Sequence, residues 1–396
     1  MGKPSGAVLS LGVAVALVAG VAMGSAGTNV MPVFIDDFAA RDGLSGAGAG
    51  LVGAAQLTAT AVVTLLLAAR AARPGRVGMA RLGLALTAFG SVWVAAADDP
   101  VTLLLTNLLL GGGLGVVYAA ATAALAAVED SDRASAVAVA GTVAVAALMI
   151  MAVPVANEQW EGAGFLVLAA CCLPAWFLVS RLPERPTSAT GAPAEARPGR
   201  PSAVLLIGTA VLWAVTQGTW AYASVLGREH TGMETSTVSV VLAVSSVVAL
   251  AGAVAGAPAA RRFGRLTSMV VFVVVEAVAM AVVVISDEPV LFTAAAVVWQ
   301  ACQLAVLVQM VAAAAVLDPS GRWVASLSGA SALGTGAGPL AVGLLLDNAG
   351  AQVLGVAFAI GMVVASLPLL RMTTAADRGR ADRGRQDGPV PTAARP

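Results

Sequence analysis

Residues 267–286 read TSMVVFVVVEAVAMAVVVIS, and in this stretch only Glu276 carries an ionisable side chain. The hydrocarbon core of a bilayer is about 30 Å thick and each helical residue rises about 1.5 Å, so about 20 apolar residues can cross it as a helix. Similar stretches recur along the whole chain, in which 59% of residues are hydrophobic and 11% are charged. This composition indicates an integral membrane protein and not an ordinary soluble domain.

The sequence predicts an all-α membrane protein of about twelve transmembrane helices, because its Ala, Leu and Val runs lack the alternation of a β-barrel. The predicted spans are 7–29, 45–69, 78–97, 101–127, 134–155, 162–180, 202–226, 235–257, 267–286, 290–316, 323–346 and 351–370. Lys3 and the small residues near Ala26 would also suit a cleaved signal peptide, but eleven further spans favour an uncleaved first helix.

Basic residues are distributed unevenly across the predicted membrane. Of the 22 basic residues, only Arg41 and Arg228 fall in predicted outer loops, which is the asymmetry expected when basic loops remain in the cytoplasm. We therefore expect both termini to be cytoplasmic, in a bacterial-type cytoplasmic membrane. The net charge is zero and the basic residues are dispersed, so nothing indicates nucleic acid binding.

The chain contains an internal repeat at an offset of 189 residues. Residues 73–76 (RPGR) align with 262–265 (RFGR), residues 98–100 with 287–289, and Arg133 with Arg322. Three loops that share one offset indicate a duplicated six-helix unit in parallel orientation. The predicted domains are a first bundle at 1–180, a cytoplasmic linker at 181–201, a second bundle at 202–370 and a disordered cytoplasmic tail at 371–396.

With twelve spans, a central linker and these two loops, the chain resembles the major facilitator superfamily. In that family the loops typically read Gly-x-x-x-Asp-Arg-x-Gly-Arg-Arg. Here Arg73, Gly75 and Arg76 match the first loop, while Ala72 replaces its aspartate; Arg262, Gly264 and Arg265 match the second, and Arg261 replaces the acid. The resemblance implies that these six matching residues take part in cytoplasmic gating.

Two stretches look like the drug and sugar efflux branches, which include proton antiporters. They are residues 218–226 (GTWAYASVL) and residues 29–32 (NVMP), which acidic residues follow. A glycine and proline pattern that efflux branches often carry in helix 5 occurs here in the eleventh span instead, at Gly334, Gly338 and Pro339. The direction of transport therefore stays open.

In the family, helices 1, 4, 7 and 10 line a central cavity, so their polar and aromatic residues are candidates for substrate binding. Trp213, Gln217 and Trp220 lie at i, i+4 and i+7 and so share one helix face; two indoles flanking an amide would suit a flat organic ligand. The full set of cavity candidates is Ser25, Asn29, Asn107, Tyr118, Trp213, Gln217, Trp220, Trp299, Gln300 and Gln303. For each of them, helix packing remains the alternative role.

Three further features concern charge and packing. Glu276 is a proton-coupling candidate because an intramembrane acid is costly when ionised, although a structural role is the alternative. Asp36 and Asp37, at the predicted outer mouth, are solvated loop residues or else gating or proton-entry groups. Gln56, Thr60 and Thr64 lie at four-residue spacing, and hydrogen bonds between helices explain this stripe at least as well as a substrate path.

These observations favour a secondary active transporter that works by alternating access as a monomer. Its expected partners are a small-molecule substrate, H⁺ and the lipid bilayer. The first hypothesis is proton-coupled efflux of a small organic or amphipathic compound. The alternatives are an importer of a small neutral metabolite and a non-transporting membrane receptor or scaffold. No enzyme, metal site or cofactor is expected, since the single histidine, His230, lies in an outer loop and no phosphate-binding loop occurs.

Overall fold

The computed structural model describes residues 7–41, 44–185, 200–318 and 322–386. Within these residues the protein is built from helices, and the one β-type pairing is an isolated bridge between Ala7 and Val128. The helices are α1 Leu11–Asn29, α2 Met31–Ala40, α3 Gly46–Ala71, α4 Arg76–Ala95, α5 Pro100–Leu125, α6 Ser131–Asn157, α7 Ala163–Leu178, α8 Ala203–Thr231, α9 Thr235–Phe263, α10 Arg265–Ile285, α11 Pro289–Leu317 and α12 Arg322–Gln386. The predicted all-helical fold is confirmed.

Eleven helical segments in the described part of the chain are long and apolar enough to cross a membrane. One of them, α12, contains two helices that meet at Gly350, where φ is 77° and ψ is 170°. Because this backbone conformation interrupts the helix, the segment supplies two crossings, and the total agrees with the twelve predicted. The first crossing is interrupted as well: α1 and α2 meet at Val30, just before Pro32, which lacks a backbone N–H.

Short polar signals in the sequence set where the helices begin. The Asp99 side chain accepts hydrogen bonds from the backbone N–H groups of Val101 and Thr102, both at 3.0 Å, and Pro100 occupies the first turn of α5. Ser45 and Ser202 cap α3 and α8 in the same way. Such caps satisfy backbone donors that have no partner inside the helix.

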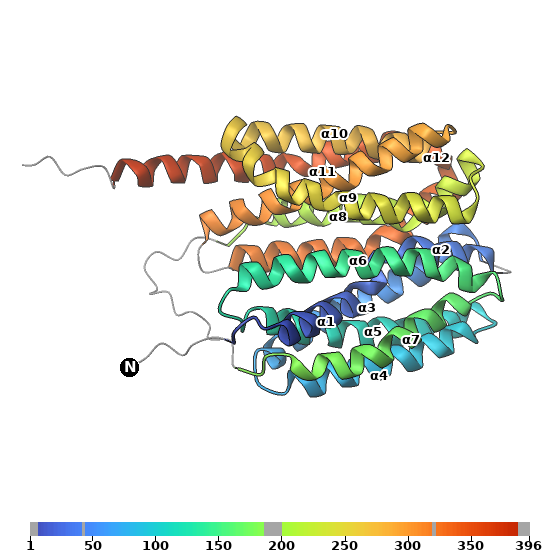
Figure 1. Ribbon diagram of the computed structural model, residues 1–396. Helices are drawn as coiled ribbons and strands as arrows, with labels where there is room; N and C mark the ends of the chain where they lie inside the picture. The colour runs from blue at the N-terminus through green and yellow to red at the C-terminus, as the bar shows by residue number, and fades with distance from the viewer. Residues whose placement is uncertain (1–6, 42–43, 186–199, 319–321, 387–396) are drawn as a thin grey trace, which may run out of the picture.

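The helices of the first half gather on one side of the molecule and those of the second half on the other (Figure 1). Across the boundary α3 packs against α12, α6 against α9, and α2 against α8. The start of α1, the end of α7 and the end of α12 lie at the same end of the molecule (Figure 1). We call the opposite end the outer end.

The C-terminal region differs from the sequence analysis. Helix α12 continues to Gln386, so residues 371–386 are helical although a disordered tail is predicted from Arg371 onward. Alanine and arginine, which are frequent in this segment, are good helix formers, and an existing helix is extended at little cost. Residues 387–396 and linker residues 186–199 lie outside the described residues.

Candidate functional site

A cavity of about 210 Å³ lies between the two halves. Its walls come from α1 and α6 of the first half and from α8, α9 and α11 of the second. The lining residues are Asn29, Val143, Ala146, Trp213, Gln217, Trp220, Ser246, Ala249, Gln300, Gln303, Leu304 and Leu307. None of these side chains is charged, so the cavity offers aromatic surface and amide groups to a ligand.

Helix α8 contributes the aromatic wall. Trp213, Gln217 and Trp220 share one face, as their spacing predicts, and all three line the cavity. The Trp220 ring meets that of Trp299 edge to face, with ring centroids 6.2 Å apart. Trp299 itself is fully buried and does not line the cavity, so it supports Trp220 from behind.

Asn29 lies at the end of α1, where the helix is interrupted. Its Nδ2 donates a hydrogen bond to Ser25 Oγ at 3.1 Å, and Ser25 Oγ donates to the Val21 carbonyl at 2.7 Å. The interruption lets Asn29 face the cavity, while Ser25, one turn earlier, does not line it but fixes the orientation of the Asn29 amide.

Two predicted cavity residues on α5 lie elsewhere. Asn107 is fully buried and donates to the Leu103 carbonyl at 2.8 Å, and Tyr118 packs against Gly24. Neither lines the cavity. Helix α5 lies too close to its neighbours to leave space here: a Cβ atom at Gly111 would be 2.1 Å from the Gln56 carbonyl oxygen.

The polar stripe on α3 forms the expected hydrogen bonds between helices. Thr60 Oγ1 donates to the Gly111 carbonyl at 3.0 Å, and Thr64 Oγ1 donates to the Gly115 carbonyl at 3.2 Å. Gln56, one turn before Thr60, is fully buried. The interpretation of this stripe as packing is confirmed for the two threonines.

The sequence analysis missed half of the cavity wall. The missed residues are Val143 and Ala146 of α6, Ser246 and Ala249 of α9, and Leu304 and Leu307 of α11. Small or apolar residues in a membrane helix look the same in sequence whether they face lipid, another helix or a cavity. The packing of α6 against α9 brings their residues to the cavity wall. No local sequence pattern predicts that these two helices pack together.

At the outer end, four polar contacts join the halves, which we call the outer clamp. In one of them Ser224 Oγ donates to Asp36 Oδ2 at 3.3 Å. Arg228 donates from Nη2 and Nε to Asp36 Oδ1 at 2.6 and 2.9 Å. Tyr222 Oη donates to the Gly46 carbonyl, and the Ala47 backbone N–H donates to Asp347 Oδ2 at 2.8 Å. Together they hold the first half against the second above the cavity.

Asp36 and Asp37 have different partners. Asp36 belongs to the outer clamp, whereas Asp37 pairs with Arg41 at 2.9 Å and accepts from the Gly162 backbone N–H at 3.0 Å, within the first half. Glu276 is 1% exposed in α10, and its Oε2 has no hydrogen-bond partner. Glu276 does not line the central cavity.

The first arginine loop is held by a carboxylate from far along the chain. Gly75 has a φ of 107°, and the backbone N–H groups of Gly75, Arg76 and Val77 all donate to the Glu184 carboxylate. The Arg76 guanidinium is fully buried and donates to the carbonyl oxygens of Ala71 and Pro183, both at 2.7 Å. Arg73 is exposed. Glu184 thus places a carboxylate at the start of α4, although the loop aspartate is absent.

Glu184 is held in its charged form by these donors. Burial of the carboxyl raises its pKa, but the three backbone N–H groups and the nearby Arg76 guanidinium outweigh that effect and hold the pKa below its usual range. The positive end of the α4 dipole acts in the same direction.

The second arginine loop is more open. Gly264 has a φ of 83° and precedes α10, which has no side-chain cap. Arg262 is exposed, and its guanidinium lies 5.4 Å from the Phe263 ring centroid. Arg265 is half-buried. The two loops therefore share a glycine with positive φ and the arginine after it, but they differ in what surrounds them.

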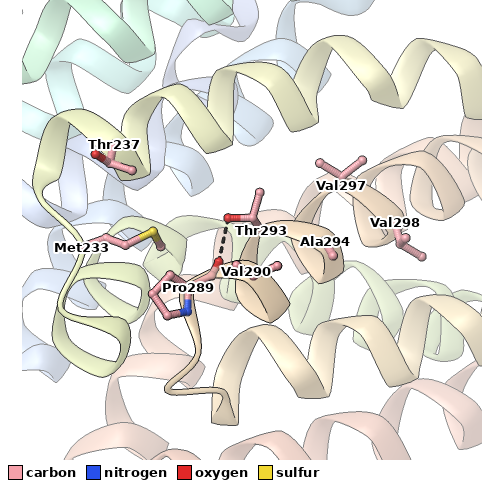
Figure 2. Close-up of a pocket in the computed structure, with 8 residues that line it drawn as sticks. All are labelled: Met233, Thr237, Pro289, Val290, Thr293, Ala294, Val297 and Val298. Atoms are coloured by element: carbon pink, nitrogen blue, oxygen red, sulfur yellow. Dashed lines mark hydrogen bonds between the residues drawn. The ribbon is translucent and has the colours of Figure 1, made fainter.

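A larger groove, of about 600 Å³, lies at the outer ends of α9 and α11. Figure 2 shows its lining residues, among them Met233, Val290 and Val298; the Thr293 hydroxyl is bonded to the Pro289 carbonyl at 2.8 Å. Val290 is 74% exposed on this face. The groove offers hardly any polar group to a ligand, whereas the central cavity is lined by several amide groups.

These features define a multi-pass membrane protein whose two six-helix halves enclose a central cavity. No family model and no curated protein matches the sequence, but its fold is found in solved structures. The nucleoside transporter NupG aligns with a TM-score of 0.71 at 14% identity, over 92% of this chain and 99% of that chain. A bacterial homologue of the human lysosomal transporter Spinster, in an inward-facing and occupied conformation, aligns with 0.67 at 16%, over 96% and 98%.

The peptide transporter POT, in complex with sulfate, aligns with a TM-score of 0.71 at 12% identity, over 93% of this chain and 94% of that chain. More particularly, then, the fold is that of the major facilitator superfamily of transporters. The resemblance that the loops and spans indicate is confirmed at the level of the fold.

Proposed function

We propose that the protein is a secondary active transporter that exports a small, flat organic or amphipathic compound in exchange for protons. The observation that carries the proposal is the uncharged cavity between the halves, in which two indoles and three glutamine amides face one space. A site of this kind binds through apolar contact with a few orienting hydrogen bonds. An organic anion is disfavoured as the substrate because no arginine or lysine lines the cavity.

Alternating access needs a closure on each side of the site. The outer clamp supplies one of them through side-chain and backbone groups of both halves, and a conformation with this clamp formed would open the cavity towards the other end. Basic residues gather at that other end, which supports a cytoplasmic location for both termini. Export as the direction rests on the resemblance of residues 218–226 and 29–32 to efflux branches.

The test is a flux assay with the purified full chain in proteoliposomes, using dyes, antibiotics and small metabolites with and without an imposed pH gradient. Trp220→Ala should lower flux at limiting substrate about 10- to 150-fold, because truncating an aromatic side chain of the site removes roughly 1.5–3 kcal/mol of apolar contact. Trp160→Ala is the matched control, since Trp160 is 48% exposed and lies outside the cavity. Equal losses in both variants would exclude the cavity as the substrate site.

Proton coupling is tested separately with Glu276→Gln, which keeps the side-chain shape but cannot ionise. If Glu276 carries the proton, flux in this variant should persist without responding to the pH gradient. An unchanged response would exclude coupling through Glu276. Net transport of a neutral metabolite into the cell would identify an importer. Tight binding without flux would identify a receptor.

A further inference from the structure

Three glutamine side chains of the central cavity form no hydrogen bond within the described part of the chain. They are Gln217 on α8 and Gln300 and Gln303 on α11, and all three line the cavity. Each is half-buried, so its carboxamide is open to the cavity and is not sealed between helices. Unpaired amides in a membrane-spanning segment are costly unless water or a ligand satisfies them.

The other polar groups of the cavity wall are partly engaged. Ser246 Oγ donates to the Leu242 carbonyl at 2.8 Å, and Asn29 Nδ2 donates to Ser25 Oγ at 3.1 Å. A hydroxyl has a single donor, so Ser246 can only accept a further hydrogen bond. The three glutamines therefore supply most of the free hydrogen-bonding groups, and each of them presents a donor and an acceptor side by side.

A carboxamide is matched by a particular kind of partner. Its N–H and C=O can form two parallel hydrogen bonds with a group that carries an acceptor beside a donor, as glutamine does with the edge of adenine. The edge of a cyclic amide, in which a ring N–H lies beside a carbonyl, has this arrangement. Trp213 and Trp220 flank Gln217 on its helix face, so a ring bonded to Gln217 would also meet aromatic surface.

We propose that the substrate is a neutral, planar nitrogen heterocycle of one or two rings with such a cyclic amide edge. This rests on the proposed function, which makes the central cavity the substrate site. The cavity volume of about 210 Å³ is below the roughly 300–1,000 Å³ of sites for drug-sized ligands, which limits the number of rings. A sugar is disfavoured, because Val143, Leu304 and Leu307 would leave hydroxyl groups of its rim without partners, whereas the faces of a heterocycle are apolar.

The experiment measures binding to the purified full chain in detergent through tryptophan fluorescence, since Trp220 lines the cavity. Uracil and hypoxanthine are the probes, and their derivatives methylated at the ring N–H beside the carbonyl are the matched ligands. The unmethylated compounds should bind about 5- to 150-fold more tightly, which is the discrimination that one edge with two hydrogen bonds provides.

Leucine substitutions separate hydrogen bonding from a steric effect of the added methyl group. Gln217→Leu and Gln303→Leu should each reduce the preference for the unmethylated compounds, whereas a steric effect would persist in both. Gln159→Leu is the matched control, because Gln159 is exposed between α6 and α7, and it should change the preference less than about twofold. Thermal unfolding checks that each variant is folded.

Equal binding of methylated and unmethylated compounds, or a preference that persists in both cavity variants, would overturn this substrate class. Displacement of uracil by an equal concentration of glucose would also overturn it and assign a hydroxyl-rich ligand. Flux of dyes or antibiotics without binding of either heterocycle would overturn the substrate class and leave the proposed transport function intact. Heterocycle binding with the expected preference but without flux would support the site and overturn transport.

Discussion

Removing Arg228 from the outer clamp should open the outer end. Asp36 and Arg228 have side chains 12% and 34% exposed, so their ion pair is neither fully solvated nor fully buried. Exposed pairs contribute about 0.2–1 kcal/mol, whereas breaking a buried pair costs about 3–5 kcal/mol. Taking about 2 kcal/mol between these limits, Arg228→Gln should shift the equilibrium towards the outward-open state roughly 30-fold.

The assay is labelling from the outside with a membrane-impermeant thiol reagent. Ser246→Cys places the reporter in the cavity wall, in a background from which Cys171, Cys172 and Cys302 have been removed. Labelling in the parent should be slow because the outer clamp is closed, and Arg228→Gln should raise its rate towards the 30-fold limit. Exchanging the charges, with Asp36→Arg and Arg228→Asp together, should restore slow labelling.

Arg41→Gln is the control for this experiment. Arg41 pairs with Asp37 at the same end of the molecule, but both residues belong to the first half. Its removal should leave the labelling rate nearly unchanged, and thermal unfolding checks that each variant is folded. If Arg41→Gln accelerates labelling as much as Arg228→Gln, or if neither does, the pair between the halves does not control the outer closure.

Three further predictions concern single side chains. Glu184→Gln should lower the free energy of unfolding by about 1 kcal/mol at pH 7. Because folding lowers the pKa of Glu184, its contribution to stability is present above the usual glutamate pKa and is lost as pH falls through the folded value. The thermal stabilities of parent and variant should therefore converge in acid. Gly50→Ala would place a Cβ atom 2.4 Å from the Pro339 carbonyl oxygen and should raise outside labelling, whereas Gly78→Ala, with nothing within 4 Å, should not. Ser25→Ala frees the Asn29 amide and should weaken substrate binding about threefold to tenfold, in line with one neutral hydrogen bond, as measured by the KM of flux; an unchanged KM would contradict the positioning role.

The fold could be predicted from the sequence because lipid allows so few alternatives. Residues 267–286 must cross the membrane as a helix, since no other structure satisfies their backbone there. The second signal is the repeat, which aligns Gly75 with Gly264, and both have positive φ in the structure. Some helix starts could also be predicted, because Asp99 before Pro100 is a local signal for the start of a helix.

The cavity-lining residues could be predicted only where their spacing along a single helix places them on one face. Trp213, Gln217 and Trp220 share a face by spacing alone, so their common exposure to the cavity follows. Trp299 does not follow, because its burial depends on how α11 is rotated against its neighbours. Asn107 has a polar side chain in a helix expected to line the cavity, yet glycines in the same helix bring its neighbours too close.

Contacts between residues far apart in the chain could not be predicted from local sequence patterns. Glu184 binds backbone N–H groups 107–109 residues away, and it lies in a segment that composition alone marks as a linker. Asp36 and Arg228 are 192 residues apart, and each looks like an ordinary loop charge. Only the packing of the helices brings these groups together.

The edge-to-face arrangement of Trp220 and Trp299 gives the protein a built-in optical signal. The strong far-ultraviolet transitions of two indoles with ring centroids 6.2 Å apart couple as excitons and should add a paired band to the far-ultraviolet circular dichroism spectrum. Trp220 faces the cavity while Trp299 is buried in the core, so a compound that tilts Trp220 would change the 68° angle between the two ring planes and with it the coupling. Occupancy of the cavity could then be followed in detergent without a label, a radioactive tracer or knowledge of the compound's own spectrum.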